Sequence, residues 1–185
     1  MKKIMIAAIV FMMTVCVLSG CGKNYDPSIV EKFPIEMSKM DFLEKAGKEF
    51  KEEDLIYCGD GIREEIAIED IEYARLITYN NQQFWGYDGQ LSFVFEMHDE
   101  YFNDLNVLKS ISFSTDTPNK KDYDKFKKKL IKLFGEPIEE NSTRGVFSIN
   151  TVWEQEDYDI ELDWAISDNL DDPGTKLTSI FLYFY

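Results

Sequence analysis

The chain has 185 residues, and its 35 acidic side chains far outnumber its 20 basic ones. The phosphates of nucleic acids repel a surface this negative, so no nucleic-acid partner is expected. Aromatic residues make up 15% of the chain, which is unlike an acidic disordered segment. The composition therefore predicts a folded, acidic protein.

The N-terminus has the pattern of a bacterial signal peptide. Lys2 and Lys3 supply positive charge, and an almost continuous apolar stretch follows at residues 4–18. This stretch is shorter than the roughly 20 residues that a membrane-spanning helix needs. We therefore interpret residues 1–20 as a signal peptide that is removed from the mature protein.

The segment ends in Leu18-Ser19-Gly20-Cys21. This motif resembles the lipobox of bacterial lipoproteins, in which a Leu and two small residues precede an obligatory Cys. The resemblance implies that the sulfur of Cys21 receives a diacylglycerol and that the chain is cut before it. The protein would then be lipid-anchored in the cell membrane and face outside the cytoplasm. An exported chain that can form no intramolecular disulfide fits a Gram-positive surface better than an oxidising periplasm. The alternative is an ordinary signal peptide that ends by chance in a cysteine.

Two features of the mature chain follow from this interpretation. Residues 21–36 contain polar residues, two prolines and little periodicity, so we expect a lipidated tether ahead of a globular domain at residues 37–185. Without Lys2 and Lys3 the charge is 18 − 35 = −17. Cys58 then has no intramolecular partner, and we expect a partly buried thiol, with a reactive thiol as the alternative.

From residue 38 the pattern predicts helical and extended segments. Ser38 can cap a helix over residues 38–52, because Phe42, Ala46 and Phe50 recur every four residues. Residues 55–72 fit either a strand or a helix. Strands are predicted at 75–79 and 84–85, at 91–97 and around 111–113, with a turn at 86–89.

The clearest helix is predicted over residues 119–134. Asn119 is a good N-cap, Gly135 suits a left-handed C-cap, and Pro137 blocks continuation. The apolar face of this helix consists of Tyr123, Phe126, Leu130, Leu133 and Phe134. Three more strands are predicted at 149–153, 160–166 and 177–185.

The two halves of the domain, 37–115 and 116–185, have similar patterns. At an offset of 182 − 113 = 69 residues, Phe113 falls on Leu182, and the same offset places Leu91 on Ile160. The shared register predicts an α+β fold, in which an antiparallel β-sheet carries one or two packed helices. Each half would be a helix followed by three strands.

One combination of motifs resembles a known group. The helix ends in Leu133-Phe134-Gly135-Glu136-Pro137 and precedes a strand with Val152-Trp153-Glu154. This layout resembles small α+β modules of bacterial lipoproteins, including the β-lactamase-inhibitor-like group, whose tandem helix-plus-sheet units present a sheet to a partner protein. Over residues 75–185 the resemblance implies a similar fold and a protein-binding role.

Residues suited to catalysis or metal binding are sparse. His98 begins a polar loop, and a carboxylate pair such as Glu64 and Glu65 is expected by chance in so acidic a chain. Residues 168–174 offer several oxygens but lack the ligand spacing of an EF-hand. No nucleophile elbow or phosphate-binding glycine loop occurs. We therefore expect no catalytic residue, metal site or cofactor.

The helix over residues 119–134 has an unusual charge. Its seven lysines and two aspartates give 7 − 2 = +5, while the rest of the mature chain carries −17 − 5 = −22. One interpretation is a solvated face whose cations pair with acidic neighbours. The other is a surface that docks to anionic headgroups or a wall polymer. The residues in question are Lys125, Lys128, Lys129 and Lys132.

The last strand is apolar on both sides. Ile180, Leu182 and Phe184 match the buried register, which leaves Phe181, Tyr183 and Tyr185 on the opposite face. Either another element of the chain covers these aromatic side chains, or they bind a protein partner.

These patterns favour a non-enzymatic surface lipoprotein that binds an unidentified protein, as an inhibitor, an immunity protein or an envelope-assembly factor. The alternative is an envelope enzyme or ligand carrier. A deep cleft lined by convergent carboxylates would favour that alternative.

Overall fold

The computed structural model describes residues 23–59, 71, 74–96, 107–116, 119–143, 148–168 and 176–185. Every helix and strand in these ranges lies between Asn24 and Phe184, so removal of a signal peptide at residues 1–20 removes none of them. Within the described ranges, no helix has the length and hydropathy needed to cross a membrane.

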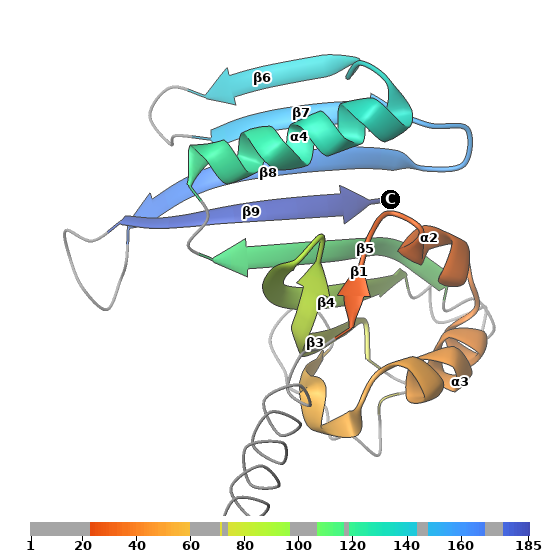
Figure 1. Cartoon of the computed structure of the whole chain (residues 1–185). Coiled ribbons are helices and arrows are strands. Elements are labelled where there is room, and N and C mark those ends of the chain that lie inside the picture. Colours follow the sequence, from red (N-terminus) through yellow and green to blue (C-terminus); the bar gives the residue numbers. More distant parts are fainter. Residues whose placement is uncertain are drawn as a thin grey trace, which may run out of the picture.

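The fold is α+β, as predicted, and one sheet of nine strands organises it (Figure 1). The strands are β1 (Asn24–Tyr25), β2 (Leu55–Gly59), β3 (Leu76–Phe84), β4 (Tyr87–Glu96), β5 (Val107–Asp116), β6 (Glu139–Thr143), β7 (Ser148–Glu154), β8 (Asp159–Asp168) and β9 (Lys176–Phe184). Their order is β1-β3-β4-β5-β9-β8-β7-β6, and β2 also pairs with β3. All pairs are antiparallel except the short β1–β3 pair.

The helices are α2 (Ile29–Lys32), α3 (Lys39–Glu49) and α4 (Lys120–Phe134), with a 3-10 turn at Glu52–Asp54. The predicted N-caps are confirmed, whereas the C-cap Gly135 has a ψ of −167° and so lies outside the left-handed helical region that was predicted. The Asp41 N–H donates to Ser38 Oγ over 3.2 Å at the start of α3. Asn119 and Asp122 form a capping box at the start of α4, and Gly135 ends this helix with φ of 85°.

Both long helices pack on the same face of the sheet, which we call the inner face. From α4, the Phe126 ring lies 6.5 Å from the Phe113 ring of β5. From α3, the Phe42 ring lies 4.6 Å from the Phe93 ring and 5.0 Å from the Phe95 ring of β4. Phe93, Phe95 and Phe113 are buried and alternate with side chains on the opposite face, which we call the outer face.

The sheet is built from two similar units joined between β5 and β9. In the first unit α3 precedes β2–β5, and in the second α4 precedes β6–β9, so each helix is followed by four strands rather than the predicted three. With Phe113 taken as the counterpart of Leu182, the pairing of β5 with β9 is two-fold symmetric, because Ile111 pairs with Phe184 as Thr115 pairs with Ile180. This register is that of a local two-fold axis.

The predicted offset of 69 residues cannot hold both for β5 with β9 and for β4 with β8. Leu91 pairs with Phe113, and the residue that pairs with the equivalent Leu182 is Leu162, not Ile160. A shift of two residues keeps every side chain on its own face, so alternation in the sequence could not reveal it.

The expected tether at residues 21–36 is also a wrong prediction, because residues from Asn24 onward belong to the folded body. Strand β1 pairs with β3, and Phe33 is fully buried against Phe42, at 5.3 Å between ring centroids, and against Phe93. The apolar side chains of α2, Ile29 and Val30, are buried as well. The polar composition and the two prolines of this segment are typical of a linker, although its few apolar side chains pack in the core.

Two smaller expectations need correction. The turn between β3 and β4 lies one residue earlier than predicted, at Trp85 and Gly86, which both have positive φ (54° and 84°). Leu133, placed on the buried face of the second helix, is 58% exposed, although its neighbour Phe134 packs against the core.

Gly89 provides a test of the packing between β4 and β5. A Cβ atom at this position would lie 2.1 Å from the Ser114 carbonyl oxygen and 2.7 Å from the Phe113 ring. Gly89→Ala should therefore lower the free energy of unfolding by about 1–3 kcal/mol in urea denaturation. The matched control is Gly47→Ala in α3, where nothing lies within 4 Å. The control should raise stability by about 0.8–1 kcal/mol, and equal effects of the two variants would contradict this packing.

Candidate binding surfaces

The outer face has an aromatic group near its centre, on β9. The rings of Phe181 and Tyr183 lie 6.1 Å apart with an interplanar angle of 14°, and both side chains are partly exposed. Tyr185, the next residue on this face, is 45% exposed. We call Phe181, Tyr183 and Tyr185 the aromatic patch. The alternation in β9 predicted this arrangement, since Leu182 between them is fully buried.

Small polar and acidic side chains flank the aromatic patch. On the β5 side, Ser112 pairs with Tyr183 and Ser114 with Phe181. On the β8 side, Glu161 pairs with Tyr183 and Asp163 with Phe181. The patch therefore has serines along one edge and carboxylates along the other.

Hydrogen bonds hold the two carboxylates in place. The Asn150 side-chain amide of β7 donates to Asp163 Oδ1 over 2.8 Å and also to Glu161. The Tyr185 hydroxyl donates to Glu161 Oε2 over 3.1 Å. Asn150 thus bridges two acidic groups that would otherwise only repel each other.

The electrostatics of the outer face are dominated by partial burial beside negative charge. Burial raises the pKa of Asp163, although the hydrogen bond from Asn150 opposes that shift. Burial and the nearby Asp163 and Glu161 raise the pKa of Tyr183. Burial and the hydrogen bond to Glu161 raise the pKa of Tyr185 to about 12. Both tyrosines therefore stay neutral hydroxyl groups at physiological pH.

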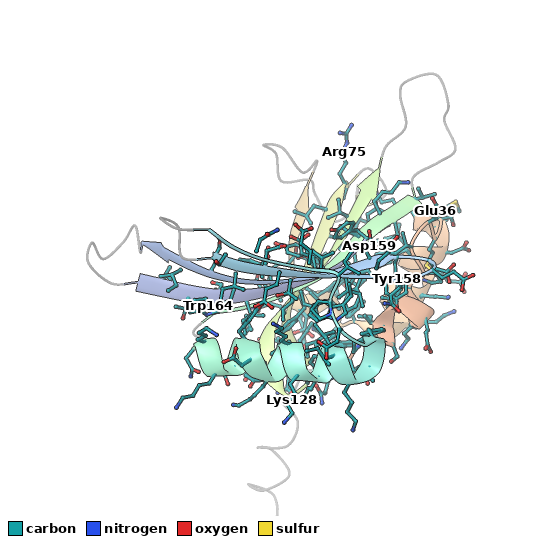
Figure 2. All side chains as sticks on the ribbon, turned by 90° about the horizontal axis from the view of Figure 1, so that it is seen from above. Glu36, Arg75, Lys128, Tyr158, Asp159 and Trp164 are labelled. Atoms are coloured by element: carbon teal, nitrogen blue, oxygen red, sulfur yellow. The ribbon has the colours of Figure 1, made fainter. Side chains whose placement is uncertain are left out.

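The lysines singled out from the sequence lie on the side of α4 that turns away from the sheet. Lys125, Lys128, Lys129 and Lys132 are all exposed, and Figure 2 shows Lys128 pointing away from the strands. We call these four residues the lysine face. Lys125 Nζ pairs with Asp122 over 2.8 Å. The other three make no ion pair with any residue in the described ranges, whereas Lys120 and Lys127 of the same helix do.

A half-open pocket of about 510 Å³ adjoins the lysine face. Its described lining consists of Tyr87, Phe126, Ile131 and the four lysines. The ring of Trp85, from the β3–β4 turn, lies 5.3 Å from the Phe126 ring, and Lys129 Nζ lies 4.8 Å from the Trp85 ring centroid. Apolar and aromatic groups therefore lie beneath a rim of positive charge.

Other residues named from the sequence fall outside the described ranges. Cys21, His98, Glu64, Glu65 and most of the acidic loop at 168–174 belong to this set. Cys58 lies in β2, opposite Ile77 of β3. Among the residues that are described, no three His, Cys, Asp or Glu side chains are grouped so that they could hold a metal ion.

Comparisons with protein-family models, curated proteins and solved structures found no match to this chain. Sequence reasoning missed Asn150, Trp85 and Tyr87, because their contacts join elements far apart in the chain.

The environment of Asp163 predicts a measurable titration. Its NMR midpoint should lie above the value of about 3.9 for Asp in unstructured peptides, because burial disfavours the carboxylate. With the folded-state pKa raised, the folded protein holds this proton more tightly than the unfolded chain. Stability should therefore fall as pH rises from the unfolded-state pKa through the folded-state pKa.

Asp163→Asn should remove this fall in stability with rising pH and should raise the free energy of unfolding at neutral pH. Asp157→Asn, at an exposed turn position, is the control and should leave the decline in place. An Asp163 midpoint at or below the peptide value would contradict the assignment.

Proposed function

We propose that this protein is a lipid-anchored module of the bacterial cell surface that binds another protein through its outer sheet face. The observation that carries the proposal is the aromatic patch. The buried side chains of α3 and α4 pack on the inner face, so these helices leave Phe181 and Tyr183 uncovered. A stacked aromatic pair amid small polar side chains is typical of the centre of a protein interface.

The negative charge around the aromatic patch and on the whole mature chain supports a basic partner. Glu161 and Asp163 border the aromatic patch, and the mature chain carries 18 − 35 = −17 charges. A partner with exposed lysine or arginine side chains would gain ion pairs at this border and cation–π contacts with the exposed rings. Attraction between opposite net charges would also accelerate encounter at low salt.

The alternative, an enzyme or carrier with acidic residues in a cleft, finds less support. The pocket beside α4 is lined by lysines and apolar side chains, not by carboxylates. Glu161 and Asp163 lie on an open strand surface and are bound to Asn150. Inhibition, immunity and envelope assembly all require a partner-binding face. The proposed function is therefore protein binding, which is common to all three roles.

The anchoring part of the proposal predicts that Cys21→Ser abolishes lipidation. Expressed in a bacterium, the native protein should be found in the membrane fraction, with a diacylglycerol adduct on its N-terminal peptide by mass spectrometry. The Cys21→Ser form should lack the adduct and should leave the membrane fraction after a wash in about 1 M salt, which screens any charge-driven attachment, because no other thiol lies at the cleavage position. Cys58→Ser is the control and should remain anchored. Normal membrane retention and processing of Cys21→Ser would contradict the anchor.

The binding part predicts position-specific crosslinking. A photoreactive phenylalanine analogue at Tyr183 should form protein adducts on intact cells, whereas the same analogue at Met40, which is 83% exposed on α3, should form none. The adduct partner should be a basic protein. Adducts of equal yield from both positions, or none from Tyr183, would contradict the proposed face.

The same face can be tested by truncation against the partner so identified. Phe181→Ala and Tyr183→Ala should each weaken binding by about tenfold or more, as expected of aromatic residues at an interface centre. Val94→Ala is the control, because Val94 is 37% exposed on the same face but two strands away. Loss of cooperative unfolding in the double variant would instead assign these side chains to the core.

A further inference from the structure

The first residues of the folded body lie against the β3–β4 turn. The Gln83 N–H donates to the Lys23 carbonyl oxygen over 3.0 Å, and the Trp85 N–H donates to the Tyr25 carbonyl oxygen over 2.9 Å. The Gly86 N–H completes the attachment with a 2.9 Å bond to Asn24 Oδ1. The chain is therefore fixed from Lys23 onward.

The position of Lys23 also has a side-chain constraint. Its ammonium lies 3.1 Å from Glu49 Oε2 of α3, and Lys32 binds the same oxygen. Burial opposes ionisation of Glu49, but the hydrogen bonds from Lys32 and Lys23 outweigh it and lower the pKa of this carboxyl. Lys23 thus lies beside the helices of the inner face.

Only two residue steps separate Lys23 from Cys21 in the sequence. A fully extended chain covers at most about 3.6 Å per residue, so two steps reach roughly 7 Å. An acylated Cys21, as proposed above, would hold the β3–β4 turn within this short reach of the bilayer surface. That turn carries Trp85, which packs on Phe126 of α4 and lies under Lys129.

We infer that the lysine face of α4, together with Trp85, docks flat on an anionic phospholipid bilayer and sets the orientation of the protein. Three observations agree on this occupant. The proposed anchor on Cys21 is too close to the folded domain to let the domain lie away from the membrane. The lysine face is positive in a protein that is otherwise strongly negative, so anionic headgroups attract this side and repel the others. Apolar groups lie beneath the ammonium rim, as an interface between headgroups and acyl chains requires.

This orientation rests on the proposed function and deepens it, because it also determines which way the outer face points relative to the membrane. Phe126 of α4 packs on the inner face, so the aromatic patch lies on the side of the sheet opposite to α4. With α4 against the bilayer, Phe181 and Tyr183 would point away from the membrane, where an external partner can reach them. The argument for proximity rests on the proposed lipidation of Cys21, whereas the first test below does not use the acyl chains.

The test uses the mature chain with Cys21→Ser, which lacks acyl groups and retains every described helix and strand. It should bind equimolar phosphatidylglycerol–phosphatidylcholine vesicles at low salt in sedimentation, and pure phosphatidylcholine vesicles far more weakly. Binding should be lost in about 1 M salt, where the Debye length is about 3 Å.

A charge-matched pair of variants separates the lysine face from net charge. Neutralising its four lysines to Gln should weaken binding to the anionic vesicles by at least about a hundredfold, given roughly fivefold for each basic residue near such a surface. The control neutralises Lys45, Lys48, Lys51 and Lys109, which all make contacts with other groups of the protein. The control should lose less than about tenfold.

The orientation is tested on the lipidated protein in the same vesicles. Brominated phospholipid should quench the part of the emission that Trp85→Phe removes, because Trp85 would reach the headgroup region while Trp153 is buried in the core. Absence of vesicle binding at low salt, equal losses in the two four-lysine variants, or unquenched Trp85 emission would each overturn the inference. Failure of partner crosslinking at Tyr183 would leave it standing, since no partner enters these measurements.

Discussion

The pairing of β5 with β9 is the contact on which the rest of the structure depends. In the described part of the chain, it is the pair that joins the strands of the first unit to those of the second. Its inward side chains include Phe113 and Leu182, which are buried and pair with each other. Its outward side chains on β9 are Phe181 and Tyr183. One ladder of hydrogen bonds therefore places both the centre of the core and the centre of the outer face.

The two-fold relationship explains why, in the described part of the chain, both long helices cover the same face of the sheet. A two-fold axis through an antiparallel strand pair runs perpendicular to the sheet, so equivalent helices fall on the same side of it. Helices α3 and α4 accordingly bury Phe42 and Phe126 on the inner face. The outer face is left to side chains that either tolerate water or bind a partner, and the serines and carboxylates around the aromatic patch fit that requirement.

The elements that local patterns define could be predicted from the sequence. Helix α4 has a cap, an amphipathic face and a stop signal within its own residues, and β9 alternates between buried and exposed side chains. The segment before α3 was missed, because Phe33 becomes a core residue only through contact with Phe42 and Phe93. The predicted patch residues came from alternation alone, whereas Asn150 bridges two carboxylates that lie 161 − 150 = 11 and 163 − 150 = 13 positions further along. A pattern within one segment of the sequence cannot predict such a bridge between strands.

The short link between Cys21 and Lys23 has a consequence for how a target would be found. Lipoproteins with long flexible linkers can sample a hemisphere of space around their anchor, but with the proposed lipid on Cys21 a domain fixed by β1 to the β3–β4 turn would have almost no radius to explore. Its search would be lateral diffusion in the plane of the bilayer, at a constant height and with a constant side presented. Such confinement raises the local concentration for targets that are themselves held at the cell surface and gives no such advantage for targets free in the medium.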